Sequence, residues 1–309
     1  MLDTIGLRLN RESVSNIDLL AEIPCYLSDV TEHYKGDQVY ISGHLKNLRV
    51  SINENGISIK GSLAKYFLND NFQTLMRSDI EQAIEQVSDE LHIPIQHARV
   101  SRLDMAQNIV TDFEPETYYG YLGECQYFMR LVQPHSLYYS NGSRTKLFYN
   151  KVIEGKHKGQ ITPHAWLNTN ILRYEYRLTN RVAKSVKKTI VEAKDLFDEQ
   201  FYMLIIDKYV EEFENINKLS RINFNTEIMN SPKDFIKQMA LLKIQEIGQI
   251  ETLSIIEEMR SKQVFNKKEY YSRLKREIKE LCKIPEITEN SELISELDQK
   301  IKAVKENYR

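Results

Sequence analysis

Over the first 190 residues, short segments in which apolar and polar positions alternate predict a sheet with packed helices. Half-buried strands alternate apolar and polar side chains and are rich in β-branched and aromatic residues. The runs that predict strands in this way are 4–10, 38–45, 46–52, 57–61, 98–110 and 171–178. Two hairpins are predicted, one through "NENG" (53–56) and one around Asn141 and Gly142 within 136–152, because Asn and Gly tolerate positive φ.

Helical periodicity is clearest over residues 78–93, where apolar side chains return to one face of the predicted helix. Those side chains are Ile80, Ala83, Ile84, Val87 and Leu91. Ser78 is the expected N-cap, and Glu81, three residues later, completes a capping box. Residues 155–170, by contrast, are polar and predict a loop.

From about residue 182 onward the sequence is charged and helix-forming. A helix is predicted over 265–283, with Asn266 as N-cap and Phe265 packed on Tyr270. Its apolar stripe consists of Tyr271, Leu274, Ile278 and Leu281. The opposite face is rich in Lys and Arg, which suits either a solvated surface or contact with DNA. Residues 289–309 predict a further polar helix with a short apolar seam, so the chain is expected to divide into domains of residues 1–190 and 191–309.

The composition, 41% hydrophobic and 28% charged, is typical of a globular chain. No run approaches the roughly 18 apolar residues that span a membrane, and the first residues lack the apolar core of a signal peptide. We therefore expect a cytoplasmic protein that does not contact a membrane. Three widely spaced cysteines exclude a disulfide framework and a Cys-rich zinc site, and predict reduced thiols that are mostly buried.

One segment is strongly basic although the net charge of the chain is −2. Residues 144–188 contain eleven Lys and Arg residues against two Glu residues, so the local charge is +9. Such a concentration of cations is what a phosphate-binding face needs. Chance clustering on a solvated surface is the alternative.

Three of the predicted strands place ionisable side chains at alternate positions, and therefore on one face. These are Arg102 and Asp104 in "SRLDMA", Tyr149 and Lys151 in "LFYNK", and Arg173, Glu175 and Arg177 in "LRYEYRL". If the strands are neighbours, the carboxylates of Asp104 and Glu175 converge as oxygen ligands suited to Mg²⁺ or Mn²⁺, with Tyr149 nearby. Taken alone, the pattern more often reflects cross-strand ion pairs and a tyrosine in the core.

A tyrosine beside a metal ion and cations is a candidate nucleophile. Its phenol, with a pKa of about 10, attacks poorly at neutral pH. A metal ion and cations favour the phenolate and stabilise the extra charge of a phosphoryl-transfer transition state. The corresponding reaction is attack on a DNA phosphodiester, which leaves a phosphotyrosine and a free hydroxyl. The sequence contains no ATP or dinucleotide loop, no H-E-x-x-H zinc motif and no H-x-x-R box of the kind found in tyrosine recombinases.

The segments "VSRLDMAQNI", "RTKLFYNKVIEGK" and "LRYEYRLTNR", in this order, resemble the replication initiators of filamentous phages and related plasmids, the gene II / gene X family. The resemblance covers most of residues 1–185, including "MLDTIGLRL" at the start. It implies a ferredoxin-like α+β fold, with helices on an antiparallel sheet, followed by a helical C-terminal region. It also implies a catalytic domain over 1–190 and a DNA-binding or oligomerisation domain over 191–309.

Carried over residue by residue, the resemblance places the nucleophile on Tyr149, with Lys151 as a second catalytic residue. It places the two acids, here expected to bind Mg²⁺ or Mn²⁺, on Asp104 and Glu175. The residues expected to bind DNA phosphates are Arg102, Arg144, Lys146, Arg173 and Arg177. Many rolling-circle nickases carry a histidine pair as a metal motif, and this sequence has none.

The implied function is an origin-specific nickase and ligase. It would cut one strand of a phage or plasmid origin and remain attached to the 5′ phosphate. The free 3′ hydroxyl would then prime rolling-circle synthesis by host helicase and polymerase. Two alternatives stay open, an origin-binding initiator without chemistry and an unrelated α+β protein. The sequence also leaves open whether the helical tail mediates a homodimer.

Overall fold

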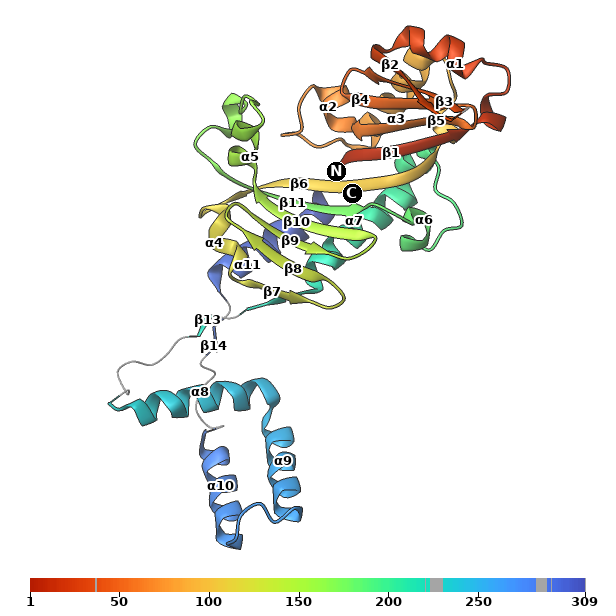
Figure 1. The fold of residues 1–309 in the computed structure, drawn as a ribbon. Coiled ribbons are helices and arrows are strands. Elements are labelled where there is room, and N and C mark those ends of the chain that lie inside the picture. Colours follow the sequence, from red (N-terminus) through yellow and green to blue (C-terminus); the bar gives the residue numbers. More distant parts are fainter. Residues whose placement is uncertain (37, 220, 223–229, 282–287, 290, 309) are drawn as a thin grey trace. The chain divides into compact units, whose positions relative to one another are not determined.

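The chain forms two compact units, Met1–Lys218 with Leu293–Arg309, and Leu219–Glu292. The computed structural model describes residues 1–309 except 37, 220, 223–229, 282–287, 290 and 309 (Figure 1). The first unit extends beyond the predicted boundary at 190. The reason is that helices α7 (Glu199–Glu214), α11 (Glu292–Lys302) and α12 (Val304–Asn307) bury their apolar side chains in its core.

The first unit is built on an antiparallel sheet that has ten strands among the described residues. Its strands are β1 (Leu2–Asn10), β2 (Ser28–Lys35), β3 (Gln38–Leu45), β4 (Leu48–Asn53), β5 (Gly56–Ser62), β6 (Arg99–Thr111), β8 (Met129–Gln133), β9 (Ser136–Ser140), β10 (Arg144–Asn150) and β11 (Asn170–Leu178). They lie in the order β2-β3-β4-β5-β1-β6-β11-β10-β9-β8. A separate pair joins β7 (Leu122–Cys125) to β12 (Ile216–Lys218).

The N-terminal half of this sheet has the ferredoxin-like topology that was predicted. The chain runs β1, α1 (Leu19–Glu22), β4, β5, α3 (Arg77–Leu91) and β6, with the β2–β3 hairpin inserted. In space these strands lie in the order β4-β5-β1-β6, which is the arrangement of a split βαβ unit. The α+β fold class is thus confirmed.

Strand β6 continues the sheet into the second half, where β11 and β10 are its next neighbours. The shorter helices of this unit are α2 (Leu63–Leu68), α4 (Pro115–Tyr119), α5 (Lys151–His157) and α6 (Val182–Ser185). In Figure 1, α7 and α11 run along one side of β6, β11 and β10. On that side Phe148 stacks on Tyr174 with ring centroids 4.4 Å apart, and both rings contact Phe213 of α7. This aromatic packing leaves the other face of the three strands for polar side chains.

Most predicted strands and both hairpins are confirmed, whereas several local details differ. Helix α3 begins at Arg77 with Met76 as N-cap, so Ser78 is not the cap. The Asp79 carboxylate accepts the Met76 backbone N–H at 2.8 Å and replaces the predicted Glu81 interaction. The predicted loop 155–170 begins inside α5. Cys25 is exposed, Cys125 is buried, and Cys282 lies outside the described residues.

The second unit contains helices α8 (Pro232–Ile247), α9 (Gln249–Ser261) and α10 (Lys268–Leu281), and a two-stranded pair of β13 (Arg221–Ile222) and β14 (Thr288–Glu289). Its core consists of Ile256, Tyr271 and Ile278. The predicted contact of Phe265 with Tyr270 is present, with ring centroids 6.2 Å apart. Among the described residues, no helix is long and apolar enough to cross a membrane.

Candidate functional site

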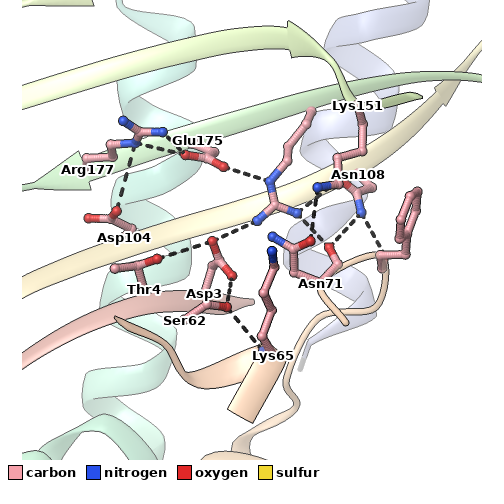
Figure 2. A network of polar contacts seen from close by, with 12 residues as sticks. Asp3, Thr4, Ser62, Lys65, Asn71, Asp104, Asn108, Lys151, Glu175 and Arg177 are labelled. Atoms are coloured by element: carbon pink, nitrogen blue, oxygen red, sulfur yellow. Dashed lines mark hydrogen bonds and ion pairs between the residues drawn. The ribbon is translucent and has the colours of Figure 1, made fainter. Parts of the chain in front are cut away.

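The three strands that were predicted to carry chemistry are neighbours, in the order β6-β11-β10. Arg177 of β11 lies opposite Asp104 of β6, and Arg173 of β11 lies opposite Tyr149 of β10. Their side chains project from the face of the sheet away from α7 and α11, as Figure 2 shows for Asp104, Glu175 and Arg177. The strand register therefore brings together the residues that the alternation singled out.

Glu175 is the centre of this cluster. Its Oε1 accepts hydrogen bonds from Arg173 Nε at 2.7 Å and from the Tyr149 hydroxyl at 2.8 Å. Its Oε2 accepts from Arg177 Nη2 at 2.6 Å and from Arg177 Nε at 2.8 Å. Burial raises the pKa of Glu175, but the two arginines together outweigh it and hold the pKa at about 2. The carboxylate is therefore ionised, and it orients the tyrosine hydroxyl.

Tyr149 is almost enclosed, with 8% of its surface exposed. Burial raises its pKa well above the ordinary value, Arg173 opposes this shift, and Glu175 adds to it. The phenol is therefore neutral in the free protein at neutral pH. Because Arg173 and Arg177 both lie near enough to attract a phenolate, they would lower the cost of losing the proton.

Asp104 is held by Arg102 through three hydrogen bonds of 2.6 to 3.1 Å. Arg177 Nε also lies 3.8 Å from its Oδ2. Burial raises the pKa of Asp104 to about 6 although both arginines oppose the shift. Asp104 thus joins Glu175 through Arg177, which touches both carboxylates.

The carboxylate oxygens of Asp104 and Glu175, the predicted ligands of Mg²⁺ or Mn²⁺, are taken up by arginine side chains. Both oxygens of Glu175 and both oxygens of Asp104 accept hydrogen bonds from guanidinium groups. Over the described ranges, no three His, Cys, Asp or Glu side chains gather closely enough to hold an ion. The positive partners of these carboxylates are arginines.

Arg173 anchors the cluster to the N-terminal half of the sheet. Its Nη1 donates to the Asn71 carbonyl at 2.9 Å and to Asn108 Oδ1 at 3.1 Å, and its Nη2 lies 3.0 Å from Asp3 Oδ2 (Figure 2). The side chain of Arg173 is 1% exposed. Sequence reasoning missed Asp3, Asn71 and Asn108. Of these three, only Asn108 could have been found from the sequence, because it lies four residues beyond Asp104 and alternation places it on the same face of β6.

Lys151 is near the cluster but not where alternation placed it. Strand β10 ends at Asn150, whose side chain caps α5 by accepting the Ile153 N–H at 3.2 Å. Lys151 is the first residue of that helix, and its buried Nζ donates to Asn71 Oδ1 and Glu154 Oε2, each at 2.9 Å. Burial, followed by the charge of Arg173, lowers its pKa. Asn71 therefore links Lys151 to Arg173, and no hydrogen bond joins Lys151 to Tyr149 among the described residues.

Arg144 and Lys146 lie on the opposite face, so the structure does not bring these two predicted phosphate contacts to Tyr149. Lys146 lies three positions before Tyr149, and an odd spacing on a strand reverses the face. Its Nζ is fully buried, 2.9 Å from Glu212 Oε2 of α7, and Arg144 Nη1 lies 3.1 Å from Glu212 Oε1. The Tyr176 hydroxyl also donates to Glu212, at 2.9 Å.

The Glu212 cluster makes a testable contribution to stability. Burial raises the pKa of Glu212, but Lys146 and its other partners outweigh it and lower the pKa below 4.5. A carboxyl group whose pKa is lower in the folded than in the unfolded protein stabilises the fold at pH values above its unfolded-state pKa. This stabilisation is lost as the pH falls through the folded-state pKa. We expect Glu212→Gln to lower the free energy of unfolding by about 2 kcal/mol at neutral pH. The difference from the unsubstituted protein should shrink below pH 4.5.

Urea unfolding followed by the fluorescence of Trp166, the single tryptophan, measures this effect in the first unit. Glu214→Gln is the control, because Glu214 is half exposed and its ion pair is loose, with Glu214 Oε1 3.9 Å from Lys302 Nζ. It should change stability by less than about 0.5 kcal/mol. Equal losses of unfolding free energy in both variants at every pH would contradict the stabilising role of the Glu212 cluster.

The fold and the site define an α+β protein in which a buried tyrosine, two carboxylates and three arginines share one open face of a sheet. A family model that describes the N-terminal part of the phage gene II protein, a replication-associated protein, matches residues 1–200. The chain belongs to this family, and it is a phage replication-associated initiator protein. No curated protein matches the sequence.

Proposed function

We propose that the chain is a tyrosine-dependent DNA nickase and strand-transferase that cuts the replication origin of a phage or plasmid. The observation that supports it most is the Tyr149 hydroxyl, held by Glu175 beside Arg173 in a member of an initiator family. In the reaction, Tyr149 Oη bonds to phosphorus and the bond from phosphorus to the 3′ oxygen breaks. The phenol loses its proton, and the 3′ oxygen gains one. The products are a 5′-phosphotyrosine and a 3′ hydroxyl that primes rolling-circle synthesis.

The arginines divide into two groups by exposure. The side chains of Arg102 and Arg177 are 35% and 29% exposed, so solvent and a DNA phosphate can reach them. Arg173 is enclosed, and it fits the role of stabilising the phenolate. Arg102 and Arg177 fit the role of neutralising the charge that develops on the phosphoryl oxygens. Because Tyr149 is also nearly enclosed, we expect DNA binding to shift the side chains around it.

An origin-binding initiator without chemistry is the second candidate. The burial of Tyr149 favours it, since a tyrosine donating to an ionised glutamate also serves as a packed core residue. Both candidates bind DNA at an origin, as an initiator of this family does. They differ in whether a covalent link between protein and DNA forms. Recruitment of host helicase and polymerase, and formation of a homodimer, stay predictions.

The requirement for Mg²⁺ or Mn²⁺ rests on the family resemblance and on the two carboxylates of Asp104 and Glu175, which share one face of the sheet. An ion at Asp104 and Glu175 would have to replace guanidinium partners of both carboxylates. We expect EDTA to stop nicking of a supercoiled plasmid that carries the origin, and added Mg²⁺ or Mn²⁺ to restore it. Conversion to open circles on an agarose gel measures this. Full nicking in EDTA would show that the arginines suffice, and no nicking of bound origin with either ion would overturn the nickase proposal.

A further inference from the structure

The outer face of β4, β5, β1 and the first part of β6 carries four exposed cations that lie opposite one another in pairs. Arg49 lies opposite Lys60, and Arg8 lies opposite Arg99. Like charges directly across an antiparallel pair destabilise a sheet. Within the part of the chain that the structure describes, none of the four makes an ion pair or side-chain hydrogen bond. An arrangement that costs stability and gains no internal partner indicates an anionic ligand.

Three of these cations, Arg8, Lys60 and Arg99, border a hollow in the sheet face. The hollow has a volume of about 350 Å³, within the range of about 300 to 1,000 Å³ that is usual for ligand sites. Its lining consists of Arg8, Lys60, Arg99, Val100, Ser101, Arg102, Thr179, Asn180, Arg181, Val182 and Ala183. Five of these residues are cations and none is an acid. The composition suits a phosphate group, which also accepts hydrogen bonds from hydroxyl, amide and backbone donors.

Gly6 keeps the floor of this face clear. It lies opposite Lys60 on one side and Arg102 on the other. A Cβ at this position would lie 2.9 Å from both the Arg102 Cβ and the Ser101 Oγ, which is too close for a packed side chain. Glycine therefore allows Arg102 to lie against β1 at the edge of the hollow.

A second hollow of about 500 Å³ continues the same face and shares Arg8 with the first. Tyr40 lines it, with 39% of its surface exposed. The Tyr40 ring stacks on the ring of His33, with centroids 4.5 Å apart and planes 11° from parallel. A supported and partly exposed aromatic ring is the kind of platform on which unpaired bases stack.

Arg102 connects the first hollow to the tyrosine site. It lines the hollow and pairs with Asp104, which Arg177 joins to Glu175 and so to the Tyr149 hydroxyl. We propose that a single strand of DNA crosses this face, with a phosphate bound in the hollow of Arg8, Lys60, Arg99 and Arg181 and a base stacked on Tyr40. The proposal rests on the proposed function, because the strand is the one that Tyr149 would cut.

The test measures binding of a fluorescein-labelled 20-nucleotide oligothymidine to the full chain by anisotropy, at several NaCl concentrations. This probe needs no origin sequence and no cleavage, so its result is independent of nicking. The double variant Arg8→Ala/Arg99→Ala should bind about 20-fold more weakly at 100 mM salt, with a salt slope lower by about 0.7, the value for one lost phosphate contact on a single strand. Urea unfolding of the same variant should show no loss of stability, because two unpaired like charges are removed.

Two further variants separate the parts of the proposal. Tyr40→Ala should weaken binding about fivefold or more without changing the salt slope, because stacking releases no counterions. Lys302→Ala, which removes an exposed cation of α11, should leave affinity and slope unchanged. Unchanged binding by the Arg8/Arg99 variant would overturn the phosphate site, and unchanged binding by Tyr40→Ala would overturn the stacking site. Tyr149→Phe should bind the probe normally, so failure of nicking alone leaves this inference standing.

Discussion

Tyr149→Phe should lower nicking of a supercoiled origin plasmid by about 10³-fold or more, because in the proposed mechanism its hydroxyl supplies the attacking oxygen. The variant removes one atom and keeps the ring in its place beside Arg173. Origin affinity, measured by gel shift, should stay within about twofold, since the hydroxyl is enclosed and its one hydrogen bond is to Glu175. If the variant lost both nicking and origin binding, this would instead indicate misfolding.

The matched control for this experiment is Tyr176→Phe. Tyr176 is also a buried tyrosine that donates to a glutamate, Glu212, at 2.9 Å, but it lies on the face that α7 covers. Its removal should cost stability comparable to that of Tyr149→Phe and leave nicking intact. Equal nicking by both variants would refute the catalytic assignment of Tyr149. Loss of nicking in Tyr176→Phe alone would place the chemistry on the other face of the sheet.

Arg173→Met should lower the free energy of unfolding of the first unit by about 3 to 5 kcal/mol, because it leaves buried partners uncompensated. Arg173 is the common partner of Asp3, Glu175, Asn71 and Asn108. Methionine fills much of the volume but offers no donor. Urea unfolding monitored by Trp166 fluorescence gives the value.

Arg99→Met is the control for the Arg173 measurement, since Arg99 is exposed and makes no ion pair among the described residues. It should change the free energy of unfolding by no more than about 0.5 kcal/mol. If Arg173→Met were as mild as Arg99→Met, the network around Glu175 would not hold the two halves of the sheet together, and its rigidity could not explain the orientation of Tyr149.

The sequence predicted the part of the site that depends on strand alternation. Glu175 and Arg177 lie on one face of β11 because they are two residues apart, and Asp104 joins them because β6 and β11 are neighbours. Tyr149 was placed correctly for the same reason. The ferredoxin-like order of the N-terminal strands came from the family resemblance, since neither alternation nor spacing specifies which strands pair.

The sequence did not predict contacts that depend on where strands end or on distant segments. Lys151 was placed on a strand because alternation continues through "LFYNK", although Asn150 is of a residue type that favours helix N-caps. Asp3 and Asn71 reach Arg173 across separations of 170 and 102 residues, which no local pattern encodes. Lys146 was counted with the phosphate contacts because charge clustering ignores side-chain direction. The partner that buries it, Glu212, lies in a helix 66 residues away.

The most direct test of the central claim locates the covalent bond. The protein would be incubated with a labelled origin strand and Mg²⁺ or Mn²⁺, then digested with nuclease and trypsin and analysed by mass spectrometry. Trypsin cleaves after Lys146 and Lys151, and the resulting peptide "LFYNK" (147–151) contains a single tyrosine, Tyr149. We predict that this peptide carries the nucleotide phosphate. A nucleotide on another tyrosine peptide, or nicked origin with no protein adduct, would contradict the account.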